Sequence, residues 1–200
     1  MLNLCSADWE PKFVDFFNGA AQSDEYLQLN RMGEVPTLVA KDLKLTQSGV
    51  ILDYLADAFE QYDATSVPVH REVLRWILFD NHKLTGSVST LRFLRTFTDQ
   101  GETDVTRFLH KRASSALRIL ENRLAESPFV VSEEPTIADI SLCGYLFWPE
   151  EIGFSWADYP HIYAWLERIK LLPGWAHPYD IMPGHPLPTE ESTEDNATAK

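Results

Sequence analysis

The segment Gly33-Glu34-Val35-Pro36-Thr37-Leu38, together with Leu45-Thr46-Gln47-Ser48-Gly49-Val50-Ile51-Leu52-Asp53-Tyr54-Leu55, decides how the first part of the chain folds. Two short apolar runs, 35–39 and 43–46, flank Ala40-Lys41-Asp42, and this pattern predicts a β-hairpin. Residues 48–59 have apolar side chains at helical spacing. The predicted buried stripe of this helix is Val50, Ile51, Tyr54, Leu55, Ala58 and Phe59. A hairpin followed by a helix start can hold a small peptide through its backbone and its carboxylate.

Two pairs of residues in this segment carry chemistry. If the peptide bond of Val35-Pro36 is cis, Val35 turns its N–H and C=O outward, where a bound peptide can pair with them as an extra strand. The alternative is a trans proline that opens an edge strand, and by base rate it is the commoner case, since about one X–Pro bond in twenty is cis. Beside the amide of Gln47, Ser48 either offers its hydroxyl and the following N–H groups to an anion or acts only as a helix cap.

The overall composition excludes several classes of function. The 200 residues carry 30 acidic and 17 basic side chains, a formal net charge of −13, which argues against binding nucleic acid or an anionic membrane. No apolar run is long enough for a membrane span, and the first residues lack the pattern of a signal peptide, so we expect a cytoplasmic protein. The two cysteines, Cys5 and Cys143, are far apart and predict reduced thiols; no histidine or carboxylate spacing indicates a metal site.

The rest of the chain divides into a small α/β part and a helical part. Residues 10–17 read as a strand because they are rich in Phe and Val, and residues 23–29 read as a short helix capped by Ser23. After a linker at 62–68, we predict one long helix over 70–97 and others over 103–124, 137–147 and from 160 onward. The predicted inward side chains of the second are Val105, Phe108, Leu109, Ala116, Leu117, Leu120 and Leu124. The expected domains are 1–61, 69–182 and a disordered acidic tail, 183–200.

The motifs of both parts together resemble one family. The Val-Pro to Gln-Ser segment resembles the glutathione-binding half of the cytosolic glutathione transferases. Thr136-Ile137-Ala138-Asp139, which predicts a capping box, resembles part of the helical domain of that family. So do Tyr159-Pro160-His161-Ile162-Tyr163-Ala164-Trp165-Leu166 and Leu172-Pro173-Gly174-Trp175. The resemblance covers roughly residues 8–182 and implies a thioredoxin-like α/β domain followed by an all-α, all-helical domain.

The resemblance also implies a ligand and the residues that bind it. Glutathione would be the co-substrate, with Val35 and the cis Pro36 pairing with its cysteinyl backbone, and Gln47 and Ser48 holding its γ-glutamyl end. A residue near Gln22 would contact the glycyl carboxylate. A small electrophile would bind beside the helical domain, and a homodimer is expected.

One face of the long helix is the candidate border of the second-substrate cleft. Leu78, His82 and Thr85 follow each other at i, i+4 and i+7, which places them together on a regular α-helix. The alternative is an ordinary, partly exposed polar face.

The sequence departs from the family at its beginning. Members start with a strand, a loop that carries the catalytic Ser, Tyr or Cys, and a helix, whereas only 34 residues precede Val35 here. Residues 2–5 look like the end of that first helix, and Cys5 looks like a packing residue, so the catalytic residue is unknown. We expect the recorded start to lie downstream of the true one; the alternatives are a real truncation or a replacement segment, perhaps from a partner. A glutathione transferase is therefore predicted, with a non-catalytic binding or regulatory module and a glutathione-dependent thiol reductase as alternatives.

Overall fold

The computed structural model describes residues 1–99 and 101–182. Its backbone contacts divide the chain into two compact units, and the division falls between Gln47 and Ser48. The helical unit comprises Ser48–Leu172, with Met1, and the hairpin unit comprises Leu2–Gln47 with residues 173–182. The helix after Ser48 packs with helices that follow it and is grouped with them here, and the domain boundary expected near residue 61 stays a prediction.

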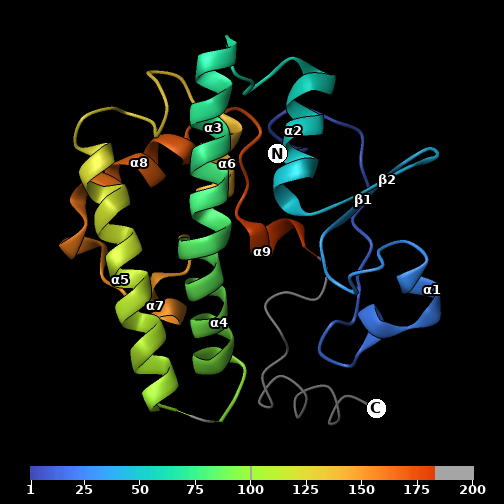
Figure 1. Cartoon of the computed structure of the whole chain (residues 1–200), viewed down its shortest axis with the longest axis horizontal. Helices are drawn as coiled ribbons and strands as arrows, with labels where there is room; N and C mark the ends of the chain where they lie inside the picture. The colour runs from blue at the N-terminus through green and yellow to red at the C-terminus, as the bar shows by residue number, and fades with distance from the viewer. Residues whose placement is uncertain (100, 183–200) are drawn as a thin grey trace, which may run out of the picture. The chain divides into compact units, whose positions relative to one another are not determined.

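The predicted hairpin is present in the hairpin unit. β1 (Thr37–Ala40) and β2 (Leu43–Thr46) are antiparallel, with Thr37 opposite Thr46 and Ala40 opposite Leu43 (Figure 1). A 3-10 turn, η1 (Ala20–Gln22), and the short helix α1 (Asp24–Leu27) precede the hairpin. The side chain of Ser23 caps α1 by accepting the N–H of Tyr26 at 3.2 Å, as the sequence predicted.

The predicted strand over 10–17 is wrong. No regular structure forms there, and the chain turns over 16–19 instead. A strand needs a neighbour to pair its N–H and C=O groups, and among the described residues the sheet consists of β1 and β2 alone. The side chains of Phe13, Phe16 and Phe17 are 57%, 50% and 48% exposed. A dense aromatic run is therefore not enough to make a strand without a partner.

The two ends of the described chain meet in the hairpin unit. Residues 2–6 form turns, and the indole of Trp9 donates to the Asn3 side chain at 2.7 Å. Gly174, whose φ is 80°, passes so close that a Cβ there would lie 2.3 Å from the carbonyl oxygen of Asn3. Only glycine fits this approach. The short helix α9 (Pro178–Ile181) follows, and the predicted tail, 183–200, lies outside the described residues.

The first helix of the helical unit is α2 (Ser48–Phe59), with the bounds that the sequence predicted. Its buried face differs from the predicted stripe: Ile51, Leu52, Leu55 and Ala56 are buried, whereas Val50 is 52% exposed. The buried face of the helix is therefore turned relative to the predicted stripe, so that Val50 faces solvent. The helix packs against α6 (Ile137–Leu142), and a Cβ on Gly49 would lie 2.8 Å from a methyl carbon of Ile77. Gly49 thus permits close packing at the start of α2.

The predicted helix over 70–97 contains a π-helical turn. α3 (Val67–Phe79) and α4 (Thr85–Thr96) are joined by η2 (Asp80–Leu84), in which the Thr85 N–H reaches back five residues to the Asp80 carbonyl. The three elements form one continuous rod, with α5 (Asp104–Leu124) beside α4 (Figure 1). The widened turn rotates the following residues relative to a regular helix.

Buried side chains hold the rod to its neighbours. The carboxylate of Asp80, which is 2% exposed, accepts hydrogen bonds from the hydroxyls of Thr85 and Ser141, at 2.7 and 2.6 Å. Ser141 belongs to α6, so this carboxylate ties the π turn to a second helix. Burial raises the pKa of Asp80, and the hydrogen bonds from Ser141 and Thr85 oppose that rise.

Helix α6 begins with the predicted capping box, although it ends at Leu142 rather than residue 147. The carboxylate of Asp139 is fully buried and accepts from the N–H and hydroxyl of Thr136, at 2.9 and 3.2 Å. It also accepts from the Val130 N–H at 2.9 Å and from the Trp165 indole at 3.0 Å. Trp165 lies on α8 (Pro160–Lys170), so Asp139 fixes a loop and two helices together.

A second buried carboxylate accepts hydrogen bonds from the first turn of α8. Glu121 of α5 is buried and accepts the N–H groups of His161 and Ile162, at 3.0 and 2.9 Å. These donors have no partner within the helix itself. The predicted inward stripe of α8, Ile162, Trp165, Leu166 and Ile169, is buried. On α5, however, Val105 and Phe108 are more than half exposed, because the buried face begins there with Thr106.

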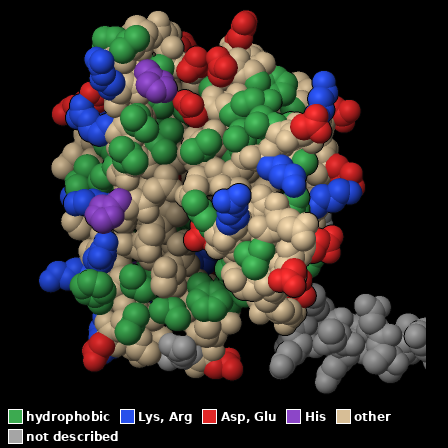
Figure 2. All heavy atoms as spheres, turned by 45° about the vertical axis from the view of Figure 1, so that its right-hand side comes forward, with side chains coloured by type: hydrophobic (Ala, Val, Ile, Leu, Met, Phe, Trp, Pro, Cys, Tyr) green, Lys and Arg blue, Asp and Glu red, His purple; other side chains and the backbone are tan. Residues whose placement is uncertain are grey.

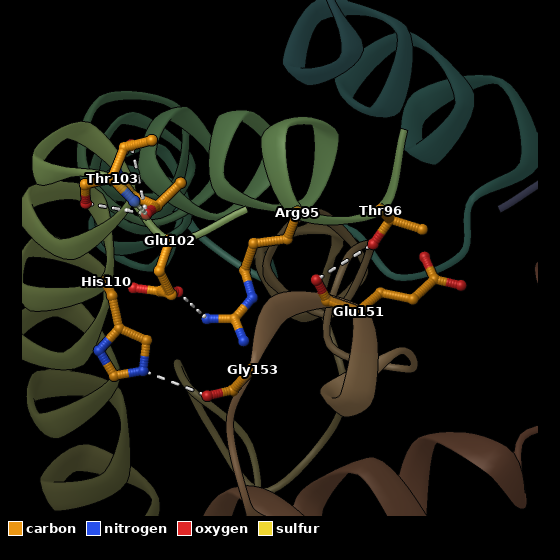
Figure 3. Close-up of polar contacts among 8 residues, drawn as sticks. Arg95, Thr96, Glu102, Thr103, His110, Glu151 and Gly153 are labelled. Carbon is orange, nitrogen blue, oxygen red and sulfur yellow. Dashed lines mark hydrogen bonds and ion pairs between the residues drawn. The ribbon is translucent and has the colours of Figure 1, made fainter. Parts of the chain in front are cut away.

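Polar contacts close one end of the helical unit, where α4, α5 and α7 (Pro149–Ile152) meet (Figure 3). Arg95 forms an ion pair with Glu102 at 3.0 Å. The Thr96 hydroxyl donates to the Glu151 carbonyl at 3.3 Å, and a ring nitrogen of His110 lies 3.1 Å from the Gly153 carbonyl. The His110 ring stacks on Phe154, with centroids 4.3 Å apart. These contacts join three helices, and the His110 ring is engaged by the Gly153 carbonyl and by Phe154.

Across 1–99 and 101–182, no helix is long and apolar enough to cross a membrane.

The face drawn in Figure 2 shows hydrophobic side chains interspersed with acidic and basic ones. Exposed apolar residues occur in both units, including Met32 and Val39 in the hairpin unit and Leu74 in the helical unit.

Candidate functional site

The candidate site is the loop that precedes β1. The carbonyl of Glu34 accepts two hydrogen bonds from buried side chains, one from the Tyr26 hydroxyl at 2.7 Å and one from the Asn30 amide at 2.6 Å. The Tyr26 hydroxyl also lies 3.0 Å from that of Thr37 in β1. We call these two residues, Tyr26 and Asn30, the carbonyl clamp. Its two hydrogen bonds to the Glu34 carbonyl fix the peptide group between Glu34 and Val35.

Val35 is the exposed residue at the centre of this loop. The Val35-Pro36 bond is cis, as the resemblance to the family implied. The Val35 side chain is 47% exposed, and within the described part of the chain neither its N–H nor its C=O forms a hydrogen bond. The backbone of Val35 therefore presents one donor and one acceptor beside a fixed peptide group, which is the arrangement that an added strand needs.

Gln47 lies next to this loop at the end of the hairpin. Its φ is 68°, a left-handed conformation that is uncommon for a residue other than glycine. Its side-chain nitrogen donates to the Glu34 carboxylate at 3.1 Å and to the sulfur of Met32 at 3.0 Å. The structure thus brings Gln47 to the Val35 loop through the side chain of Glu34.

Two further predicted residues have clear local positions. The Gln22 amide donates to the Gly33 carbonyl at 3.1 Å, and a Cβ on Gly33 would lie 2.4 Å from the same nitrogen. Gln22 therefore supports the loop, and its donor faces the chain rather than solvent. Ser48 follows Gln47 directly and is the first residue of α2, half-buried.

The structure does not support a shared face for the three candidates on the long helix. Leu78 is 60% exposed and His82 is exposed, but the Thr85 hydroxyl is half-buried and donates to Asp80. The π turn between residues 80 and 84 changes the spacing on which the prediction depended. Leu78 and His82 keep accessible side chains, whereas Thr85 has a structural role.

Neither cysteine has the properties of a nucleophile. Cys5 is 5% exposed and Cys143 is 7% exposed. Burial raises the pKa of the Cys5 thiol, and it raises the pKa of the Cys143 thiol to about 12. The reactive form of cysteine is the thiolate, so both side chains are held in their unreactive form near neutral pH. Among residues 1–99 and 101–182, no group of three or more His, Cys, Asp or Glu side chains is arranged to hold a metal ion.

No sequence motif marked the carbonyl clamp or Glu34. Tyr26 was visible as an apolar residue of a short helix, and Asn30 as a polar residue before a turn. One signal was available: a tyrosine and an asparagine four residues apart, shortly before a Val-Pro pair. Their common acceptor, however, is a main-chain carbonyl, and no side-chain pattern marks such an acceptor.

Comparison with known proteins agrees with both halves of the chain. Residues 1–57 match the family described as glutathione S-transferase, N-terminal domain, and residues 90–173 match the C-terminal domain. Glutathione S-transferase F14 of Arabidopsis thaliana is 31% identical over 208 aligned positions, covering 94% of this chain and 82% of that protein.

Solved structures show the same similarity. A glutathione S-transferase from Pseudomonas fluorescens is 32% identical with a TM-score of 0.81, covering 88% of this chain and 89% of the other. One from Xanthobacter autotrophicus is 29% identical with a TM-score of 0.82, covering 88% and 86%. These matches confirm the predicted fold, a thioredoxin-like part with a small sheet and an all-helical part. By its sequence and its fold, the chain belongs to the cytosolic glutathione transferase superfamily.

Proposed function

We propose that this protein binds glutathione and transfers its thiol to a small electrophile. The observation that carries the proposal is the Val35 backbone, whose N–H and C=O have no hydrogen-bond partner within the described residues, next to a peptide group that the carbonyl clamp fixes. The cysteinyl residue of glutathione has a matching N–H and C=O. Membership of the superfamily supports this choice of peptide.

The γ-glutamyl end of glutathione would be held by Gln47 and by the next residue, Ser48. Glutathione is an anion, and the formal charge of −13 disfavours its approach. Local donors are therefore needed, and the free N–H groups at the start of α2, a helix of 12 residues, provide them. Gln22 would serve the glycyl end indirectly, by supporting Gly33. On the helical unit, Leu78 and His82 are our candidates for contact with the electrophile.

In the proposed reaction, the thiolate sulfur of glutathione attacks the electrophilic carbon, and the leaving group departs with its electron pair. The thiol proton goes to solvent. The chain's own contribution, as proposed, is to hold and orient the tripeptide. The thiol reductase alternative loses support, because both cysteines are buried with raised pKa values. We also propose that the protein is cytoplasmic and forms a homodimer; light scattering tests the dimer.

Calorimetric titration with glutathione tests the binding step, and a chlorodinitrobenzene assay tests transfer. We expect saturable binding, about tenfold weaker in Gln47→Ala because a side chain that contacts the ligand is lost. Formation of the thioether with release of chloride supports a transferase. Binding without thioether identifies the non-catalytic module, and no binding to the unaltered protein refutes the proposal.

A further inference from the structure

We propose that Met32 is a site of reversible oxidation by peroxide, and that its sulfoxide lowers the affinity of the protein for glutathione by displacing the side chain of Gln47. Both residues belong to the hairpin unit. The oxidation step depends on the structure of this unit alone, whereas the effect on affinity rests on the proposed function. Three observations support the inference: the exposure of Met32, its contact with Gln47, and the fixed backbone of the turn that carries it.

The first observation is the exposure of Met32. The chain has three methionines; Met32 is 59% exposed, Met182 is 38% exposed, and Met1 is half-buried. A thioether has no proton to lose, so its oxidation needs only contact with the oxidant. The two thiols are buried, and burial raises their pKa, which keeps them from oxidants in an unreactive form. We therefore expect peroxide to oxidise the Met32 sulfur before any other sulfur of the folded chain.

The reaction needs one molecule of hydrogen peroxide. A lone pair of the Met32 sulfur attacks one peroxide oxygen, the O–O bond breaks, and the departing hydroxide becomes water by taking up the remaining proton. The sulfur is oxidised by two electrons to the sulfoxide, and the peroxide is reduced to water. Methionine sulfoxide reductases reverse the step with two thiols, which become a disulfide as the oxygen leaves as water.

The second observation is the contact between Met32 and Gln47. The amide nitrogen of Gln47 donates one hydrogen bond to the Met32 sulfur at 3.0 Å and another to the Glu34 carboxylate at 3.1 Å. An amide nitrogen has two hydrogens, so these two acceptors account for both of them. The thioether of Met32 is thus one of the two groups that hold the side chain of Gln47 in place.

Oxidation changes this contact in both charge distribution and size. A thioether sulfur is a weak acceptor, whereas a sulfoxide is polar and accepts through its oxygen. An N–H···O hydrogen bond itself needs about 2.9 Å between its heavy atoms, so an oxygen does not fit between the sulfur and the nitrogen as they stand. Either the sulfur withdraws from Gln47, or the new oxygen turns away and the amide loses one acceptor. The Gln47 side chain is displaced in both cases.

The third observation is that the backbone under Met32 is fixed. The N–H of Met32 donates to the side-chain oxygen of Asn30 at 3.0 Å, and the Gly33 N–H donates to the Asn30 carbonyl at 3.0 Å. Asn30 is 3% exposed, and its side-chain nitrogen also donates to the Glu34 carbonyl at 2.6 Å. Because one buried side chain holds the turn on both sides of Met32, the added oxygen is accommodated by side chains. Gln47 is the side chain in contact with the sulfur.

The test combines peptide mapping with calorimetry on three proteins: the unaltered chain, Met32→Leu, and Met182→Leu as a matched control. Leucine is similar in size to methionine and has no sulfur to oxidise. Met182→Leu removes an exposed thioether from the same unit and keeps the contact between Met32 and Gln47. Each folded protein is treated with hydrogen peroxide, the excess is destroyed with catalase, and half of the sample is then repaired with methionine sulfoxide reductases. Mass spectrometry locates the sulfoxide, and calorimetric titration gives the affinity for glutathione before treatment, after it, and after repair.

We expect Met32 to be oxidised faster than Met182 and Met1. The affinity of the unaltered protein and of Met182→Leu should then fall about fivefold and recover on repair. This loss is smaller than the loss expected for Gln47→Ala, because the amide is displaced and not removed. The affinity of Met32→Leu should be the same before and after peroxide.

Three results would overturn the inference in different parts. Oxidation of Met182 or Met1 ahead of Met32 refutes the proposed modification site. Complete oxidation of Met32 without a change in affinity refutes the coupling through Gln47, and an equal loss of affinity in Met32→Leu assigns the effect to another residue. If the untreated protein does not bind glutathione, the proposed function and the effect on affinity both fail, while the peptide map still decides whether Met32 is the oxidation site.

Discussion

The indole Nε1 of Trp165 lies 3.0 Å from Oδ1 of Asp139, so the middle of α8 donates to the carboxylate that begins α6. Both side chains are fully buried. All four hydrogen bonds to the Asp139 carboxylate come from N–H or O–H groups, so its surroundings require a side chain that only accepts.

Asp139→Asn is expected to destabilise the protein by about 3 kcal/mol, because its amide nitrogen would face buried donors on at least one side. Urea unfolding followed by far-ultraviolet circular dichroism measures the loss. Glu133→Gln, an exposed change in the loop before α6, is the control and should have no measurable effect. A loss below about 1 kcal/mol for Asp139→Asn would contradict the role given to the four donors.

Asp80 should make stability depend on pH. Burial raises its pKa in the folded protein above the ordinary value of 3.8, so the folded state holds this proton more tightly than the unfolded chain does. The contribution of Asp80 to stability is therefore complete below that value and declines as pH rises through the folded pKa. The side chain in Asp80→Asn does not titrate. As pH rises from about 4 to neutrality, the free energy of unfolding of the variant should therefore increase relative to that of the unaltered protein.

Urea titrations at several pH values measure this difference. Asp57→Asn, an exposed change on α2, is the matched control. Curves for Asp80→Asn and the unaltered protein that stay parallel over the whole range would show that Asp80 does not titrate differently in the folded state.

The thiols should be inert in the native protein. With the pKa of Cys143 raised to about 12, the thiolate fraction near pH 8 is roughly a thousandfold below that of a free cysteine. We expect dithionitrobenzoate to react slowly with the folded chain and to release two equivalents of thiol after unfolding in guanidinium, one for each cysteine. Rapid release of one equivalent from the folded protein would show that one of the two cysteines is reactive in the native state.

The carbonyl clamp should matter for glutathione binding, if the proposed function holds. Tyr26→Phe removes one of the two donors to the Glu34 carbonyl, so the Val35 backbone should be less well fixed and glutathione affinity should fall about threefold to tenfold. Calorimetry gives the affinity, and a melting curve confirms that the variant is folded. Tyr163→Phe, a half-exposed position on α8, is the control. Unchanged affinity in Tyr26→Phe would mean that Asn30 alone positions the loop.

The sequence predicted the elements whose residues interact locally. The Ser23 cap, the hairpin and the Thr136 capping box depend on residues a few positions apart, and all three are present. The resemblance supplied the cis bond before Pro36, and the structure has it. What the sequence could not show depends on distant partners. Residues 10–17 lacked a strand to pair with, and the π turn at 80–84 is stabilised by Ser141 of another helix.

The same distinction applies to the candidate site. Val35 and Gln47 were identified from motifs, but the structure alone shows that Glu34 joins them and that Tyr26 and Asn30 hold Glu34 by its main chain. Hydrogen bonds to main-chain carbonyls leave no requirement on the identity of the accepting residue. Pattern reasoning therefore finds the residues that touch a ligand more readily than those that support them.

The approach of Gly174 to Asn3 has a consequence for biosynthesis. The two residues are separated by almost the full length of the chain, yet both belong to the hairpin unit. During synthesis from the N-terminus, residues 48–172 emerge as a complete compact unit before residue 174 does. The hairpin unit begins first in the sequence, but it cannot be complete until the segment from Pro173 onward has been synthesised. The part of the protein proposed to hold glutathione can therefore complete its contacts only after the helical unit has been synthesised.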